Sequence, residues 1–212
     1  MSEETVTADV AADEDVNVRH REKMKKRKSA RDKLMASKTE ERGLIIVHTG
    51  KGKGKSSSAW GMALRCLGHG YKIGVVQYIK GRRETGEHKF FAMFPDLVTH
   101  KIMGEGFTWE TQDRERDIAA ATAAWEASKE MMADPEIRMV ILDELNIALR
   151  YEYVDLDDVL DTLAAKRPDL HVVITGRNAK PELIELADLV TEMTLIKHPF
   201  REGVRGQPGV EF

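Results

Sequence analysis

A glycine- and lysine-rich run between residues 49 and 57 constrains the fold more than any other stretch of this chain. The run comprises Thr49, Gly50, Lys51, Gly52, Lys53, Gly54, Lys55, Ser56 and Ser57. It follows an apolar, β-branched segment at 44–47, which predicts a buried strand, and it opens the segment 55–67, which predicts a helix. A strand, a glycine-rich loop and a helix in this order are the context of a phosphate-binding P-loop.

The chemistry of such a loop follows from its glycines. Glycine allows positive φ, which turns successive backbone N–H groups toward one point, and the helix N-terminus adds about half a positive charge there. We expect Lys55 to hold phosphate oxygens and the Ser56 hydroxyl to ligate Mg²⁺. The loop is one residue shorter than the usual pattern, so that Thr49 occupies the usual glycine position. A flexible basic turn is the alternative interpretation.

Two acidic residues follow another apolar run. Asp143 and Glu144 come directly after residues 139–142, which predict a buried strand. Carboxylates at the end of a central strand are the usual partners of a P-loop in holding Mg²⁺. We therefore expect a metal site here, and which of the two contacts the metal directly stays open. The alternative is that the pair caps the following helix.

Predicted strands and helices alternate through the rest of the chain. Strands are expected near 44–47, 72–79, 97–102, 139–142, 171–175 and 190–196, and helices near 55–67, 112–133, 156–165 and 181–187. This order predicts an α/β domain over residues 43–212, with a mainly parallel sheet flanked by helices on both faces. The Pro- and Gly-containing tail from Lys197 is expected to lie on the domain as an extended segment.

The residues before this domain divide by charge. Residues 1–18 are acidic and poor in bulky apolar groups, which predicts a disordered tail. Residues 19–42 are basic and free of proline, which predicts a helical arm. The arm is either a solvated helix or a lid over an anionic ligand or a neighbouring subunit. Because the compact domain has no comparable basic stripe, we do not expect nucleic acid as a partner.

The cellular compartment can be inferred from three simple features. Cys66 is the single cysteine, so no intrachain disulfide can form. No apolar stretch approaches the roughly 20 residues of a membrane span. The N-terminus is acidic where a signal peptide would be basic and then apolar. We therefore expect a cytoplasmic protein with no membrane partner.

Two further segments carry candidate ligand contacts. Phe107 and Trp109 lie in a glycine-flanked loop at 104–111, where they either pack in the core or close over a flat apolar ligand. Arg114 follows on the next predicted helix and is either a ligand contact or a surface residue. Arg177 follows the strand at 171–175, at the carboxyl edge where ligands gather in open α/β sheets; it either binds phosphates or belongs to an ordinary turn.

Several segments together resemble one known enzyme family. They read TGKGKGKSSSAWGMALR, QYIKG, GEGFTWETQDRERD, VILDELN, VITGRNA and KHPFREGVRGQPGVEF. From about residue 43 to the C-terminus the chain resembles the P-loop type of ATP:corrinoid adenosyltransferase. The resemblance implies a RecA-like sheet, a homodimer, and a role in cobalamin synthesis or corrinoid salvage. It also implies that the basic arm is a candidate lid over the active site.

The same resemblance implies a mechanism. Reduced cobalt, Co(I), attacks C5′ of Mg²⁺-bound ATP and displaces triphosphate, while a separate reductant supplies Co(I). Lys55 would bind the phosphates, and Phe107 and Trp109 would press on the lower corrin face and exclude an axial ligand. Arg114 would contact the corrinoid. Ser56 and Glu144 would ligate Mg²⁺, with Asp143 in support.

Two rival functions remain open on the sequence. A P-loop ATPase or kinase would release phosphate or ADP in place of triphosphate, and the FTWET segment argues against it. A RecA-like nucleic-acid-binding module would use the basic arm, and its binding would fall steeply with salt.

Overall fold

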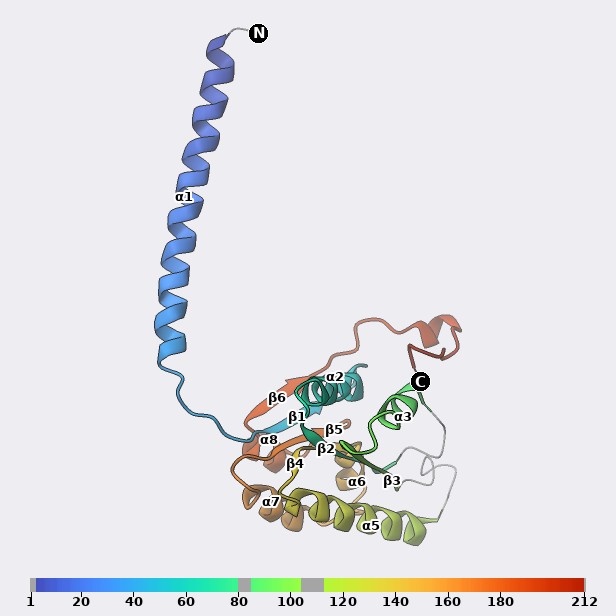
Figure 1. The fold of residues 1–212 in the computed structure, drawn as a ribbon. Helices are drawn as coiled ribbons and strands as arrows, with labels where there is room; N and C mark the ends of the chain where they lie inside the picture. Colours follow the sequence, from blue (N-terminus) through green and yellow to red (C-terminus); the bar gives the residue numbers. More distant parts are fainter. Residues whose placement is uncertain (1–2, 80–84, 104–112, 212) are drawn as a thin grey trace. The chain divides into compact units, whose positions relative to one another are not determined.

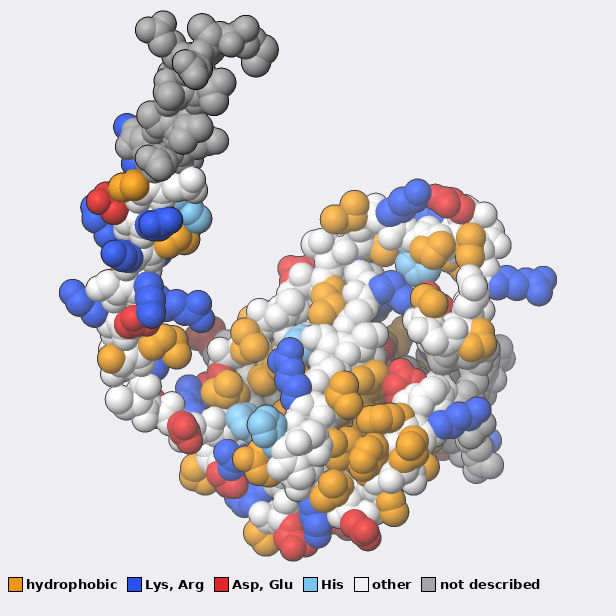
Figure 2. Space-filling model, turned by 45° about the horizontal axis from the view of Figure 1, so that its top comes forward, with side chains coloured by type: hydrophobic (Ala, Val, Ile, Leu, Met, Phe, Trp, Pro, Cys, Tyr) orange, Lys and Arg blue, Asp and Glu red, His pale blue; other side chains and the backbone are white. Residues whose placement is uncertain are grey.

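The computed structural model describes residues 3–79, 85–103 and 113–211 (Figure 1). The chain divides into two compact units, residues 1–41 and residues 42–212. The first unit is the helix α1 (Glu3–Ala36), whose side chains are described from residue 17 onward and are exposed and rich in Lys and Arg (Figure 2). The helix begins at Glu3, inside the segment for which the sequence predicts a disordered tail.

The second unit is built on a six-stranded sheet in the order β3-β2-β4-β5-β1-β6. The strands are β1 (Ile45–Thr49), β2 (Lys72–Gln77), β3 (Val98–Ile102), β4 (Ile137–Asp143), β5 (His171–Thr175) and β6 (Leu189–Glu192). Every pairing in the sheet is parallel. The four inner strands are buried on both faces, which explains why their sequences are nearly continuous apolar runs.

Helices cover both faces of this sheet (Figure 1). One face carries α2 (Lys55–Gly68) and α3 (Gly86–Phe91), which pack on apolar side chains such as Ile46 and Val75. The other face carries α5 (Arg114–Ala133), α6 (Leu145–Arg150), α7 (Leu156–Ala164) and α8 (Pro181–Leu186). The architecture confirms the predicted α/β, RecA-like domain with a mainly parallel sheet.

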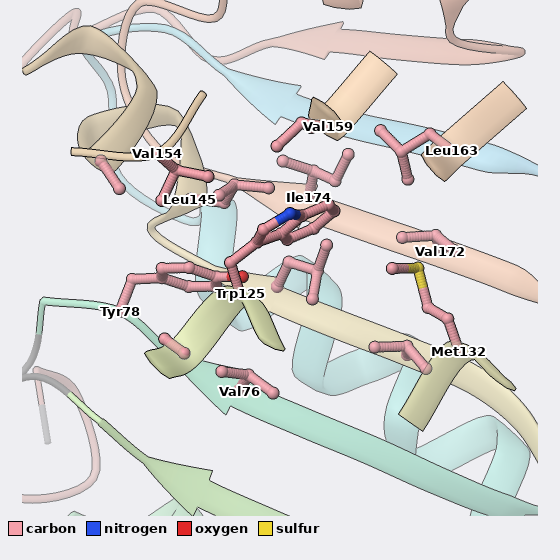
Figure 3. Packing of buried hydrophobic residues seen from close by; sticks show 14 of the residues in the cluster. Val76, Tyr78, Trp125, Met132, Leu145, Val154, Val159, Leu163, Val172 and Ile174 are labelled. Atoms are coloured by element: carbon pink, nitrogen blue, oxygen red, sulfur yellow. The ribbon is translucent and has the colours of Figure 1, made fainter. Parts of the chain in front are cut away.

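The larger part of the core lies under α5 (Figure 3). Trp125 of α5 is buried at the centre of this cluster, near Leu145 and Ile174. Its indole nitrogen donates a hydrogen bond to Asp158 of α7 at 2.7 Å, so the polar end of the ring is satisfied. This packing fixes β4 and β5, whose carboxyl ends carry residues of the candidate site.

The structure adds elements that the sequence analysis did not predict. The helices α3 and α6 are only six residues long, too short for a periodic pattern to reveal. The tail predicted as extended contains a 3-10 helix, η1 (Pro199–Glu202), in which Pro199 occupies the first turn and Gly203 follows at φ 79°. None of the helices in the described part of the chain combines the length and apolar character needed to cross a membrane.

Candidate functional site

The P-loop connects β1 to α2 and depends on its glycines. Gly50 and Gly54 have φ of 96° and 104°, a conformation that side chains larger than hydrogen disfavour. Gly52 is pressed against the segment after β6, and its N–H donates to the Met193 carbonyl at 2.6 Å. A Cβ at Gly52 would lie 2.6 Å from the Thr194 carbonyl oxygen, so no larger residue fits without a shift. The sequence therefore needs glycine at these positions.

Lys55 is the first residue of α2, and its side chain is held inside the loop. The residue is 7% exposed, and its Nζ donates to the Gly52 carbonyl at 2.6 Å. Burial lowers the pKa of Lys55, the nearby Glu144 carboxylate opposes this shift, and the positive charges of Arg177 and Lys53 lower the pKa further. The ammonium group is thus already desolvated and directed by the loop that would surround a phosphate.

The acidic pair at the end of β4 divides into two environments. Asp143 is fully buried, and its two carboxylate oxygens accept hydrogen bonds from Thr175 Oγ1 at 2.8 Å and from Gln77 Nε2 at 3.0 Å. Glu144 turns out of the strand with φ of 66°, and its backbone N–H donates to Thr175 Oγ1 at 3.0 Å. A non-glycine residue at such a φ costs about 1–3 kcal/mol and is typical of functional sites.

These elements enclose a cavity of about 480 Å³. The wall contains Gly52, Lys53, Gly54, Lys55, Ser56, Ser57, Trp60, Gly86, Glu87, Glu144, Arg177, Gly209, Val210 and Glu211. The carboxyl end of β4, the start of α2 and the C-terminal segment therefore meet at one place. Glu211 forms an ion pair with Lys53 of the P-loop, and both residues line the cavity.

Most of the predicted P-loop residues line this cavity, and three have other positions. The wall holds the residues from Gly52 to Ser57. Thr49 lies at the end of β1 and its hydroxyl accepts a hydrogen bond from the Ala179 N–H at 3.0 Å, which ties the P-loop strand to the loop after β5. Gly50 supplies the turn, and Lys51 is exposed.

The remaining predicted residues lie around or beyond the cavity. Arg177 lines it, directly after Gly176, whose φ is 127°. Asp143 is not part of the wall and lies beneath Glu144 in the buried end of β4. Arg114 is exposed in the first turn of α5. Phe107 and Trp109 lie outside the described residues.

Sequence reasoning missed several residues that the structure brings to the site. Trp60, on the first turns of α2, lines the P-loop cavity and a second, apolar cavity of about 350 Å³. Leu64 and Phe90 line the apolar cavity, and hydrophobic side chains gather on this side of the unit (Figure 2). The role of Gln77 and Thr175 was missed because each is a single polar residue at the end of an apolar strand. Only the strand order reveals that they flank Asp143.

Comparison with known proteins shows the family to which this chain belongs. Residues 41–212 match the family described as ATP:corrinoid adenosyltransferase BtuR/CobO/CobP. The chain is 56% identical over 194 residues to the corrinoid adenosyltransferase of Pseudomonas aeruginosa, which covers 92% of this chain and 96% of that protein. It is 55% identical to the corrinoid adenosyltransferase of a Sinorhizobium species over the full length of both chains. The corrinoid adenosyltransferase CobA of Salmonella typhimurium is 44% identical over 194 residues, covering 92% of this chain and 98% of that protein. The chain belongs to the ATP:corrinoid adenosyltransferase family.

Proposed function

We propose that the chain binds Mg²⁺-ATP in the P-loop cavity and transfers the 5′-deoxyadenosyl group to the cobalt of a reduced corrinoid. The Co(I) electron pair forms the bond to C5′, and the bond from C5′ to the phosphate oxygen breaks, so that its electrons leave with triphosphate. The observation that carries this proposal is Lys55, a buried lysine in the wall of a cavity that Glu144 and Arg177 also line. Because Co(I) is itself a strong nucleophile, the protein needs no general base.

The main task of the P-loop is to stabilise the charge of the leaving triphosphate. Lys53, Lys55 and Arg177 bring three positive charges to the cavity wall. The backbone N–H groups of the loop and the start of α2 add partial positive charge at the same place. The bond from Lys55 to the Gly52 carbonyl holds the ammonium group ready, and phosphate oxygens would replace that carbonyl. Such preorganised charge lowers the barrier because it needs no rearrangement during the reaction.

The residues of the cavity fit a magnesium ion. Ser56 and Glu144 line the same wall and offer the hydroxyl and carboxylate oxygens that Mg²⁺ prefers. When bound, Mg²⁺ supplies positive charge against the triphosphate oxygens. Ser56 and Glu144 would hold the ion directly. Asp143, buried beneath Glu144 and held by Gln77 and Thr175, would support the site from behind.

The corrinoid would lie beside this phosphate site. The apolar cavity lined by Trp60, Leu64 and Phe90 supports the binding of a flat apolar group next to the P-loop. By resemblance to the family, Phe107 and Trp109 would exclude the axial ligand from the lower corrin face, which eases reduction to Co(I) because apolar surroundings favour the less charged metal. Arg114, exposed after that loop, would contact corrin amides or phosphates.

The same resemblance supports the wider setting. The chain would act as a homodimer in the cytoplasm, in cobalamin synthesis or corrinoid salvage, with Co(I) supplied by a separate reductant. The basic arm at 19–42 would serve as a lid over the active site, where its positive charge suits an anionic ligand.

An anaerobic assay with ATP, Mg²⁺ and chemically reduced cob(I)alamin tests the proposal. We expect a light-sensitive alkylcobalt product together with one triphosphate for each product formed. Lys55→Ala should lower kcat by about 100-fold or more, the usual cost of removing a group that stabilises transition-state charge. The matched control is Lys72→Ala, which removes an exposed lysine paired with Glu136 and should leave kcat unchanged. An unchanged corrinoid spectrum with release of ADP and phosphate would contradict the proposal.

A further inference from the structure

A row of polar side chains crosses the sheet beneath the candidate site. Residues at the carboxyl ends of parallel strands share a face when their register positions match or differ by two. Gln77 of β2 is opposite Asp143 of β4, and His100 of β3 is opposite Val75, two residues before Gln77. Thr175 of β5 follows Ile174, whose partner in β4 is the residue before Asp143. The row therefore runs through β3, β2, β4 and β5 on the side that carries α2 and α3.

The centre of the row is the side-chain amide of Gln77, which is 2% exposed. Its Oε1 lies 2.7 Å from His88 Nε2 and 3.2 Å from His100 Nε2. Because a carbonyl oxygen only accepts, both imidazoles donate from Nε2. Two donors on Oε1 fix which way the amide points, so that its Nε2–H faces Asp143 Oδ2 at 3.0 Å.

The other half of the row connects Asp143 to the cavity wall. The Thr175 hydroxyl donates to Asp143 Oδ1, and its oxygen accepts the Glu144 N–H. The bond from the Glu144 N–H to Thr175 holds the Glu144 backbone at its positive φ and keeps Glu144 in the cavity wall. A continuous chain of hydrogen bonds thus runs from His88 of α3 to the backbone of Glu144. His88 also adjoins Gly86 and Glu87, which form part of the same wall.

We propose that Gln77, oriented by His88 and His100, is a positioning residue that holds the Asp143 carboxylate and, through Thr175, the backbone of Glu144 in the geometry that binds Mg²⁺-ATP. The inference rests on the proposed roles of Asp143 and Glu144 in holding the metal. A buried carboxylate that loses a donor turns toward other partners, because an unsatisfied buried charge is costly. The two histidines are interchangeable in this role, since either donor alone is enough to fix the amide.

The first test replaces Gln77 with glutamate in the full-length protein. Gln77→Glu keeps the shape and the acceptor for both histidines, and it puts an oxygen in place of the N–H that faces Asp143. ATP binding in Mg²⁺ should weaken about 10- to 100-fold, the equivalent of losing a hydrogen bond to a charged group, and ATP binding in EDTA should stay within about twofold. The matched control is Tyr78→Phe. Tyr78 directly follows β2 and packs on the opposite face of the sheet, so the loss of its buried hydrogen bond to Ser128 should change neither binding constant.

The second test asks whether the histidines act through Gln77. His88→Phe and His100→Phe should each lower kcat less than about threefold, and the double variant should lower it at least about tenfold with the KM for the corrinoid unchanged. Equal weakening of ATP binding with and without Mg²⁺ in Gln77→Glu would overturn the inference, as would a double histidine variant within twofold of the wild type. Absence of adenosyl transfer by the wild-type protein would instead contradict the proposed function, and the binding measurement would still decide the role of Gln77.

Discussion

At the scale of single residues, His48 should make the stability of this protein sensitive to acid. The side chain is 3% exposed in β1, and neither ring nitrogen has a hydrogen-bond partner among the described residues. Burial lowers the pKa of His48 below its ordinary value of 6.5. Below about pH 6.5 the unfolded chain therefore binds a proton that the folded chain does not, and the free energy of unfolding falls by up to about 1.4 kcal/mol per pH unit.

The measurement compares chemical unfolding at pH 7.5 and pH 5.5. His48→Phe should lose less stability than the wild type over this interval, because phenylalanine keeps a flat ring at this position and cannot bind a proton. His69→Phe, at an exposed position, is the control and should lose as much as the wild type. Equal losses in the wild type and His48→Phe would show that protonation of His48 does not contribute.

The candidate site also shows what a sequence reveals residue by residue. The glycines of the P-loop and the acidic pair after β4 were found because their neighbours in sequence predict their structural context. The choice between Asp143 and Glu144 as the direct metal ligand stayed open, because a strand pattern does not say at which residue the chain leaves the strand. The structure has Glu144 at positive φ in the cavity wall and Asp143 buried beneath it. Gln77 and Thr175 belong to two other strands, so only tertiary structure brings them to Asp143.

At the scale of elements, the C-terminal segment is where pattern and structure differ most. The four inner strands were predicted because apolar runs are typical of parallel strands buried on both faces. The segment after Lys197 has no such apolar run, and its position at the P-loop depends on contacts between residues distant in sequence. Gly209, Val210 and Glu211 line the cavity, and Glu211 pairs with Lys53. The Glu211 carboxylate therefore pairs with the Lys53 ammonium group, which the triphosphate of ATP would need.

Removal of that carboxylate should favour nucleotide binding. Glu211→Gln should lower the KM for ATP by up to about fivefold with kcat unchanged, since a partly exposed ion pair contributes about 1 kcal/mol at most. Glu202→Gln is the control, because Glu202 pairs with Lys197 outside the cavity and should leave KM unchanged. An increase in KM for Glu211→Gln would mean that the carboxylate contacts the bound nucleotide instead of competing with it.

At the scale of the whole molecule, removal of the first unit should leave the stability of the second unit unchanged and should affect only activity. The described side chains of α1 are exposed, so the helix buries little apolar surface of its own. The match to the family begins at residue 41, close to the start of the second unit. A chain of residues 42–212 should therefore unfold at the same denaturant midpoint as the full chain, because the buried side chains of the core belong to the second unit.

Activity should respond differently if the basic arm is a lid. The shortened chain should keep its affinity for ATP and lose about tenfold or more in kcat/KM for the corrinoid, because a lid excludes water and holds the second substrate in place. Lowering the positive charge of the arm within the full chain, with Lys25, Lys26 and Lys28 replaced by Gln, distinguishes the effect of its charge from the effect of its physical coverage. A loss in this variant that disappears at high salt would assign the effect to electrostatic attraction, since screening weakens exposed charges. Full activity of the shortened chain would mean that the arm is a solvated helix, and that the second unit alone carries out the reaction.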